Sequence, residues 1–219
     1  MHIFVADIHL RPGMGDDALR FVSWLEQMKE TASHIYILGD LFDYFYTGLE
    51  PRIQYILSAL QSPRIHLIVG NRDFLLKNMG RSSINLIRFE EQIISLYGRN
   101  VLIAHGHTLT DADRGFRLLH RYGWPVLARA DRWLPAGFKD RCARFLVKSS
   151  AAIRPPHASI DMGIAQSKGV HTVICGHLHR AAMSDQLIVL PAFFDTGNWL
   201  IWDAHGPRFA DPSIETKRS

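Results

Sequence analysis

The stretch Ile3-Phe4-Val5-Ala6-Asp7-Ile8-His9 decides how the rest of the chain is interpreted. Four consecutive apolar residues predict a buried strand, and an acid and an imidazole follow where such a strand gives way to a loop. Because Asp7 and His9 are two residues apart, both side chains can turn towards one point, as metal ligands do. A polar pair also closes many strands without any such role, so the rest of the sequence must decide between the two interpretations.

The same arrangement recurs four times along the chain. Each time, an apolar run ends in a group that can bind a metal ion. These groups are Asp40 after residues 35–38, Asn71 after 65–69, His105 after 101–104, and His177 and His179 after 170–175. Glycines at positions 39, 70, 106 and 176 stand beside them and allow the backbone to turn tightly. The recurrence favours one shared site.

Helical patterns separate the first three strands. Asp16 or Asp17 can cap a helix that runs to about Thr31. Its apolar positions recur at helical spacing and predict a core face made of Leu19, Val22, Leu25 and Met28. A second helix is expected from about Pro51 to Leu60. Strands separated by helices pair in parallel through right-handed crossovers, so their following loops gather at the edge where α/β sheets bind ligands.

The second half of the chain has a different pattern. Residues 92–96 and 101–104 flank Tyr97-Gly98-Arg99-Asn100 and predict a hairpin. The sequence is helical in character from Thr110 to about Lys168, further strands are expected at 170–175, 187–190 and 200–202, and the tail from Ala210 is expected to fray. The predicted fold is α/β, with two facing mixed β-sheets flanked by helices, in one domain of residues 1–219 with a helical insertion at 110–150.

Composition narrows the class of protein. With 219 residues and 47% apolar content, the chain can bury a core. No apolar run reaches the roughly 18 residues of a membrane helix, and the N-terminus lacks the basic and apolar segments of a secretion signal. Cys142 and Cys175 form no close-spaced metal pair and are expected to be reduced thiols. These features predict a cytoplasmic protein, and nothing indicates a protein partner.

Basic residues concentrate between Arg114 and Lys148, although the formal net charge is only +4. The stretch also contains Arg117, Arg121, Arg129, Arg132, Lys139, Arg141 and Arg144, opposed by Asp131 and Asp140. Such a field attracts phosphates, nucleic acid or an anionic membrane surface. A solvated helix face is an equally good interpretation.

The candidate ligands favour a two-metal centre. They are Asp7, His9, Asp40, Asn71, His105, His177 and His179. Oxygen and imidazole ligands without thiolates suit manganese, iron(II) or zinc. Seven ligands exceed the needs of one ion, and a bridging Asp40 would hold two ions about 3.5 to 4 Å apart, as in phosphatases and nucleases. Such ions would lower the pKa of a shared water and neutralise charge on phosphoryl oxygens.

In order and spacing, these stretches resemble the motifs of the calcineurin-like metallophosphoesterases. The family pattern is D-x-H, G-D, G-N-H-[DE], a single His and G-H-x-H, which here spans residues 7 to 179. The resemblance implies two divalent ions, Mn²⁺ in the first place, with Fe²⁺ or Zn²⁺ as alternatives. It assigns Asp7, His9 and His179 to one ion, Asn71, His105 and His177 to the other, and Asp40 to both.

Arg72 departs from this pattern, because the family places a catalytic His there. An arginine stays protonated and cannot act as a general acid, but its planar fork can hold two phosphate oxygens. The change favours a leaving group that needs little protonation, such as the phosphate end of a diphosphate. We expect Asn71, Arg72 and His177 to act in catalysis. A decayed enzyme is the alternative, against which the complete ligand set argues.

The stretch G-N-R-D-F-L-L at residues 70–76 is similar to one subgroup, the UDP-2,3-diacylglucosamine diphosphatases of lipid A synthesis. Residues 37–42 and 96–106 add to the similarity, as does a helical insertion after the fourth motif. The resemblance implies cleavage of a UDP-linked diacylated glucosamine at the α-phosphate, giving UMP and an acylated sugar 1-phosphate. The expected place of action is the inner face of the cytoplasmic membrane, as a peripheral protein on an anionic surface, and no nucleic-acid partner is expected.

The insertion contains the apolar side chains that a lipid substrate requires. They are Trp124, Val126, Leu127, Trp133, Leu134, Phe138, Phe145 and Leu146. Acyl chains could lie between such helices while arginines meet phosphates or a membrane, although the same residues could simply pack the insertion onto the sheet. The expected substrate contacts are Arg72, Asp113, Arg114, Lys148 and Ser149.

Three departures from the subgroup leave the substrate open. His107 stands where an Asp is usual, Lys148-Ser149-Ser150 only approximates a Ser-Lys segment, and Leu178 replaces a Thr. The alternative enzyme is a phosphodiesterase or phosphatase acting on a soluble nucleotide or nucleic acid, and the third hypothesis is a non-catalytic scaffold. The other histidines are predicted to be structural or solvated: His2, His34, His66, His120, His157, His171 and His205.

Overall fold

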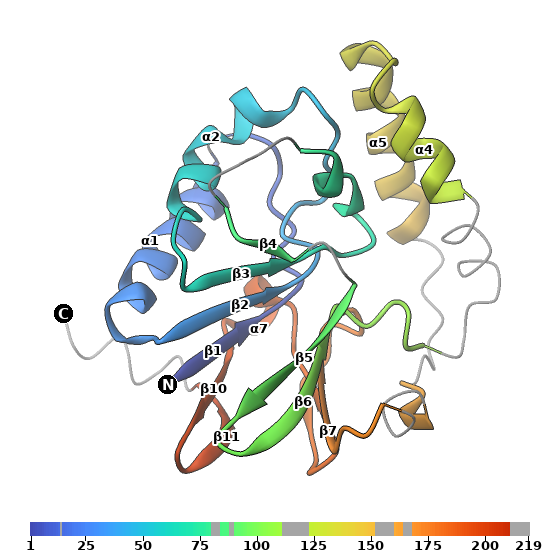
Figure 1. Cartoon of the computed structure of the whole chain (residues 1–219). Helices are drawn as coiled ribbons and strands as arrows, with labels where there is room; N and C mark the ends of the chain where they lie inside the picture. Colours follow the sequence, from blue (N-terminus) through green and yellow to red (C-terminus); the bar gives the residue numbers. More distant parts are fainter. Residues whose placement is uncertain are drawn as a thin grey trace.

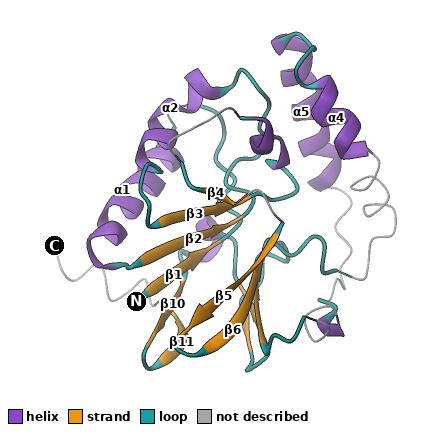
Figure 2. Ribbon diagram, in the orientation of Figure 1, coloured by secondary structure: helices purple, strands orange, loops and turns teal. Residues whose placement is uncertain are grey.

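The computed structural model has two β-sheets that face each other, with helices outside the first sheet (Figures 1 and 2). It describes residues 1–13, 15–79, 84–87, 90–110, 123–151, 160–163 and 168–210, with the backbone alone at 86–87, 146 and 148–151. The predicted fold class, two facing mixed sheets flanked by helices, is confirmed.

The first sheet has six strands in the order β11-β10-β1-β2-β3-β4. Their bounds are β1 His2–Val5, β2 His34–Leu38, β3 Ile65–Ile68, β4 Leu86–Ile87, β10 Leu200–Asp203 and β11 Gly206–Phe209. Strands β1 to β4 are parallel, whereas β10 and β11 add antiparallel pairs. The register places Val5 opposite Ile37 and Leu38 opposite Ile68, so the loops after β1, β2 and β3 leave side by side.

The second sheet has five strands in the order β5-β6-β7-β9-β8. They are β5 Glu91–Leu96, β6 Arg99–Ala104, β7 Thr172–Cys175, β8 Ala182–Met183 and β9 Leu187–Val189. The predicted hairpin is the antiparallel β5–β6 pair, while β6, β7 and β9 run in parallel. The short strands β4, β8 and β11 were not predicted; β11 contains Pro207, which a strand at the edge of a sheet tolerates.

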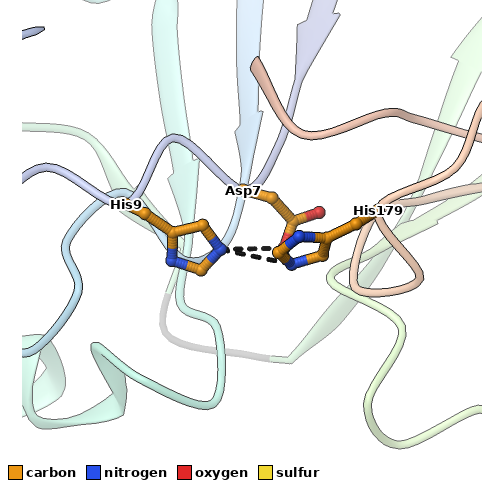
Figure 3. Close-up of side chains that lie close together, drawn as sticks. All are labelled: Asp7, His9 and His179. Carbon is orange, nitrogen blue, oxygen red and sulfur yellow. Dashed lines mark hydrogen bonds and ion pairs between the residues drawn. The ribbon is translucent and has the colours of Figure 1, made fainter. Parts of the chain in front are cut away.

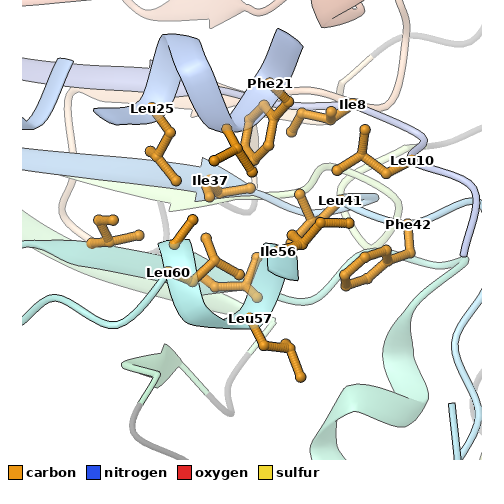
Figure 4. Packing of buried hydrophobic residues seen from close by; sticks show 14 of the residues in the cluster. Ile8, Leu10, Phe21, Leu25, Ile37, Leu41, Phe42, Ile56, Leu57 and Leu60 are labelled. Carbon is orange, nitrogen blue, oxygen red and sulfur yellow. The ribbon is translucent and has the colours of Figure 1, made fainter. Parts of the chain in front are cut away.

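Helices α1 (Asp16–Thr31) and α2 (Glu50–Ala59) cover the outer face of the first sheet. Figure 4 shows Phe21 and Leu25 of α1 and Ile56 of α2 packed around Ile37 of β2. A second core lies between the sheets, where Phe4 and Leu38 meet Val101, Ile103 and Ile174. Alternate residues of each strand therefore serve different cores, as the two-residue repeat of a strand requires.

Two details of the predicted α1 are wrong. Leu19 is 43% exposed, and the buried face is Ala18, Phe21, Val22, Trp24, Leu25 and Met28. Leu19 is about 100° around the helix from Ala18, which turns it out of this face. Neither Asp16 nor Asp17 caps the helix, because the N-cap is Gly15; the two acids occupy the first turn, where they favour the positive end of the helix dipole.

The stretch predicted as helical from Thr110 to Lys168 gives two described helices, α4 (Trp124–Ala130) and α5 (Ala136–Ala151). Thr110 instead forms an isolated antiparallel bridge with Ile160. Residues 111–122, 152–159, 164–167 and the tail from 211 lie outside the described residues. In the part of the chain that is described, no helix is long and apolar enough to cross a membrane.

Candidate metal centre

All seven predicted ligands lie in loops at the carboxyl ends of strands, where the two sheets meet. The first sheet contributes Asp7 and His9 after β1, Asp40 after β2 and Asn71 after β3, and the second contributes His105 after β6 and His177 and His179 after β7. Backbone hydrogen bonds join neighbouring loops: Asp7 N donates to Gly39 O (3.1 Å) and Gly176 N donates to His105 O (2.9 Å). The predicted set is thus gathered at one edge.

One group of these side chains consists of Asp7, His9 and His179 (Figure 3). The two Nε2 atoms of the histidines are 3.2 Å apart, and Oδ1 of Asp7 lies 3.2 Å from His179 Nε2 and 3.8 Å from His9 Nε2. Figure 3 shows the two rings approaching each other with the carboxylate beside them. Two imidazole nitrogens and one carboxylate oxygen that converge in this way fit a borderline divalent cation.

The protonation states of this group suit metal binding. Burial lowers the pKa of His9 to about 3, so its ring is neutral at pH 7 and keeps a lone pair. Burial by itself would raise the pKa of Asp7, but a hydrogen bond with His179 and the charge of His105 outweigh burial and lower the pKa to about 2. A carboxylate and a neutral imidazole are the forms that coordinate metals.

A second group consists of Asp7, Asp40 and His105. His105 Nδ1 donates to Leu38 O (2.9 Å), which turns Nε2 towards Asn71 Oδ1 (3.0 Å) and Asp40 Oδ1 (3.6 Å). Burial raises the pKa of Asp40. Burial opposes a charged His105, but the carboxylates of Asp40 and Asp7 outweigh burial and raise its pKa. The same two carboxylates would attract a cation.

The remaining contacts at the candidate site concern His177 and Asp40. The ring of His177 lies edge-on to that of His105 with centroids 5.1 Å apart, and its backbone N donates to Asp7 Oδ2 (2.7 Å). Asp7 belongs to both groups of converging atoms, whereas Asp40 belongs to the second. The bridging role of Asp40 and the division of the seven ligands between two ions stay predictions.

The backbone is strained at five of the seven candidate ligands. Among the described residues other than glycine, positive φ angles occur at Asp7 (53°), His9 (56°), Asp40 (50°), His177 (69°) and His179 (52°), and otherwise only at Tyr97 in the β5–β6 hairpin. Such angles cost roughly 1–3 kcal/mol each and persist only where the surrounding structure enforces them. Their concentration at one place marks this edge as functional.

Close approach, rather than turn geometry, explains two of the glycines. A Cβ atom at Gly70 would lie 2.1 Å from Asp40 Oδ1, and one at Gly176 would lie 2.4 Å from the Cβ of Ala6 and 2.6 Å from Asp7 Oδ2. The predicted tight turn applies instead to Gly39 and Gly106, whose φ angles are +84° and +118°.

Asp73 is a structural member of the centre that the sequence did not reveal as such. Its buried carboxylate accepts hydrogen bonds from Gly70 N (2.7 Å), Leu41 N (2.8 Å) and Phe42 N (3.3 Å). Burial and the charge of Asp40 raise the pKa of Asp73 to about 7. Asp73 thereby ties together the loops after β2 and β3. Its place at the end of the third motif was the available signal.

Arg72 lies at the rim of the centre. Its backbone N donates to Asp40 Oδ1 (2.9 Å), its Nε is 3.7 Å from Asp40 Oδ2, and its Nη1 donates to Asp43 Oδ1 (3.1 Å). The side chain is 13% exposed. Its charge therefore stands beside the predicted metal ligands, where it can meet an anionic substrate.

Hydrogen bonds attach helices α4 and α5 to the loops at the same edge of the sheets. The carboxylate of Asp131, after α4, accepts hydrogen bonds from Thr47 N (3.1 Å) and Asn78 Nδ2 (3.2 Å), and Lys139 Nζ donates to Thr47 O (2.7 Å). Burial alone would raise the pKa of Asp131, but the bonds from Thr47 and Asn78 outweigh it and lower the pKa. Because Thr47 follows β2 and Asn78 follows β3, this places the helix pair over the loops of the centre (Figure 1).

The apolar side chains of the insertion divide into two kinds. Trp124 is buried, stacks on Phe74 at 4.1 Å and lies 5.4 Å from the ring of His107, so it packs the insertion onto the body. The others with described side chains are exposed: Val126, Leu127, Trp133, Leu134, Phe138 and Phe145. Packing onto the body of the protein therefore accounts for Trp124, and the side chain of Leu146 is outside the described part.

The remaining predicted residues have varied positions. Asp113 and Arg114 lie outside the described residues, and of Lys148 and Ser149 the structure describes only the backbone in α5. His107 is buried between His105 and Trp124, with ring centroids 5.4 Å from each. Cys142 and Cys175 are free thiols, as predicted.

Three of the histidines predicted to be structural, His2, His34 and His66, lie together at the opposite end of the first sheet. His2 stacks on His34 at 5.3 Å, and His34 Nδ1 lies 2.9 Å from His66 Nε2. None of these three belongs to either group of converging metal-binding atoms found among the described residues.

Known proteins are similar to this chain over most of its length. The family described as calcineurin-like phosphoesterase matches residues 3–181. The UDP-2,3-diacylglucosamine hydrolase of Yersinia enterocolitica is 31% identical over 200 residues, covering 83% of this chain and 82% of that protein. That of Pseudomonas aeruginosa is 32% identical over 199 residues, covering 82% of each. A phosphoesterase from E. coli aligns with a TM-score of 0.47 and 14% identity, covering 93% of this chain and 88% of that chain.

Proposed function

The chain belongs to the calcineurin-like phosphoesterase family, and from that premise we propose that it hydrolyses the diphosphate of a UDP-linked diacylated glucosamine. The reaction would attack the α-phosphate and release UMP and an acylated sugar 1-phosphate. Family membership and the buried groups of histidines and aspartates imply divalent metal ions. Mn²⁺ is the proposed ion, because the ligands are oxygens and imidazoles without thiolates.

The observation that carries the proposal is the helix pair α4–α5, which is fastened over the centre and presents apolar side chains to its surroundings. Trp133 is 88% exposed and Phe145 is 69% exposed. A soluble phosphate ester gives such side chains nothing to contact, whereas the acyl chains of a lipid do. The similarity to the Yersinia enterocolitica and Pseudomonas aeruginosa enzymes supports the same substrate class.

The proposed ligands to the ions are Asp7, His9, Asp40, Asn71, His105, His177 and His179. Bound ions would lower the pKa of an attacking water and neutralise charge on the phosphoryl oxygens. Arg72 would add a fixed positive charge at the rim and hold phosphate oxygens, and it supplies no proton. The leaving sugar phosphate needs little protonation at neutral pH, so the absence of a histidine at position 72 is compatible with this reaction.

The proposed site of action is the inner face of the cytoplasmic membrane. Arg129, Arg132 and Arg141 are exposed on the insertion beside the apolar side chains. Exposed aromatic and apolar groups interleaved with arginines suit the boundary between anionic headgroups and acyl chains. In this arrangement the insertion would contact the lipid surface while the centre meets the diphosphate.

The test is hydrolysis of UDP-2,3-diacylglucosamine by the purified protein with Mn²⁺, with UMP release as the readout. The expected result is UMP release that is lost in Asp40→Asn. Turnover of bis(p-nitrophenyl) phosphate without UMP release would overturn the lipid substrate and favour a soluble nucleotide. Absence of bound metal after reconstitution with Mn²⁺ would indicate a non-catalytic scaffold.

A further inference from the structure

Asp43 is a carboxylate beside the centre that none of the motifs includes. It lies three residues after Asp40, in the loop that follows β2, and its side chain is 17% exposed. Its Oδ1 atom is 3.1 Å from Arg72 Nη1 and 3.5 Å from His9 Nδ1. Oδ1 of Asp43 therefore faces both Arg72, which is proposed to hold phosphate oxygens, and His9, which is a proposed metal ligand.

The contact between Asp43 and His9 affects how His9 can bind a metal ion. His9 Nε2 points to His179 and Asp7, so it can coordinate an ion only when the ring proton is on Nδ1. Nδ1 is buried, and the carboxylate of Asp43 is the acidic group that faces it. A negative charge at 3.5 Å favours a proton on Nδ1, as carboxylates beside metal-binding histidines generally do.

The contact between Asp43 and Arg72 affects how Arg72 can bind the substrate. Nη1 donates to Asp43 and Nε faces Asp40 at 3.7 Å. Within the described part of the chain, Nη2 makes no hydrogen bond or ion pair. The two carboxylates thus fix the plane of the guanidinium and leave one edge of its fork for phosphate oxygens.

A third contact of Asp43 is weaker. Arg11 Nε lies 3.8 Å from the other oxygen, Oδ2, but the Arg11 side chain is 91% exposed and solvent screens the pair. The short contact to the largely buried Arg72 therefore dominates.

We propose that Asp43 is a positioning residue that orients His9 towards the metal and Arg72 towards the substrate phosphate at the same time. The Arg72 part of this inference rests on the proposed function. A carboxylate so placed links metal binding to phosphate recognition, because its loss releases both side chains. The competing interpretation is that Asp43 only neutralises Arg72, in which case its removal would strengthen phosphate binding.

The experiment compares Asp43→Asn with wild type in three assays: Mn²⁺ affinity by isothermal titration calorimetry, UMP affinity of the Mn²⁺-loaded protein, and kcat and KM for UDP-2,3-diacylglucosamine. We expect Mn²⁺ affinity to fall about 10-fold, within the range for partners that orient metal ligands. UMP affinity is expected to fall and KM to rise by several-fold. Asp43→Glu, which keeps the charge, is expected to restore part of each loss.

Asp203→Asn is the matched control, because Asp203 also pairs with an arginine, Arg208 Nη1 at 2.6 Å, but on β10 and β11. It should leave all three measurements unchanged. Wild-type Mn²⁺ affinity in Asp43→Asn would overturn the role towards His9, and tighter UMP binding would overturn the role towards Arg72. Failure of the wild type to release UMP from the lipid would refute the proposed substrate instead, and the metal assay would still test Asp43.

Discussion

Replacing Asp73 with asparagine is expected to weaken the hydrogen bonds that support the loops of the metal centre. Asp73 is not itself one of the predicted ligands. The carboxylate accepts three backbone hydrogen bonds, from Gly70, Leu41 and Phe42. An amide of the same shape has one oxygen and one NH₂ group. If the oxygen keeps Leu41 and Phe42, the NH₂ group faces Gly70 N, which loses its acceptor.

The expected loss of folding stability follows from the number of hydrogen bonds that each substitution removes. A buried donor left without an acceptor costs about 1–3 kcal/mol, which is the expected destabilisation of Asp73→Asn. Asp73→Ala removes all three acceptors and is expected to cost about 3–5 kcal/mol, at the upper end for single substitutions. Because the freed loops carry Asp40 and Asn71, Mn²⁺ affinity is also expected to fall about 10-fold in the asparagine variant.

The pH dependence provides a second signature. Burial and Asp40 raise the pKa of Asp73 from 3.8 to about 7, so the metal-free folded protein keeps this proton between those values and the unfolded chain does not. The resulting stability is fully present below pH 3.8 and is lost as the pH rises through 7, by at most about 4 kcal/mol. Asparagine cannot ionise, so the stability deficit of the variant should be larger at pH 5 than at pH 8.

The assay is urea unfolding of the metal-free protein at pH 5 and pH 8, combined with calorimetric titration of Mn²⁺. Asp203→Asn again serves as the control, since its ion pair with Arg208 lies away from the centre. An Asp73→Asn protein with the wild-type midpoint at pH 5 and wild-type Mn²⁺ affinity would refute the reasoning. A deficit that grows from pH 5 to pH 8 would refute the assigned direction of the pKa.

Three further predictions concern the centre and the insertion. Gly176→Ala would place a Cβ atom 2.6 Å from Asp7 Oδ2, so we expect a loss of about 1–3 kcal/mol in thermal unfolding and weaker Mn²⁺ binding; an unchanged melting temperature contradicts the close approach. Arg72→His supplies a proton donor and should raise turnover of an alkyl phosphate relative to the diphosphate by about 10-fold or more, whereas a constant ratio of the two rates argues against that role for Arg72. Trp133→Glu, at an 88% exposed position, should keep the melting temperature and reduce cosedimentation with anionic vesicles; equal sedimentation of both proteins excludes Trp133 from the lipid contact.

Local sequence was sufficient to predict the main strands and to bring the candidate ligands of the first sheet together. Each apolar run predicts a strand by itself, and parallel pairing brings the carboxyl ends of the strands to one edge. Asp7, Asp40 and Asn71, which follow three parallel strands of one sheet, could therefore be placed near one another from their positions along the chain alone, whereas His105 belongs to the other sheet. Chemistry at single positions, such as the positive charge of Arg72, likewise follows from residue type alone.

Only the tertiary structure could decide what holds the centre in place. Asp73 binds Leu41 and Phe42 across about thirty residues of chain, and Asp43 meets Arg72 across a similar separation. Asp131 fastens the insertion to Thr47 across more than eighty residues. Apolar periodicity records which face of an element is buried, but it carries no information about which distant loop a polar side chain will meet. The sequence by itself therefore determined the fold class and the grouping of the candidate ligands on the first sheet, whereas hydrogen bonds between distant segments decided what supports these loops and how the insertion is oriented.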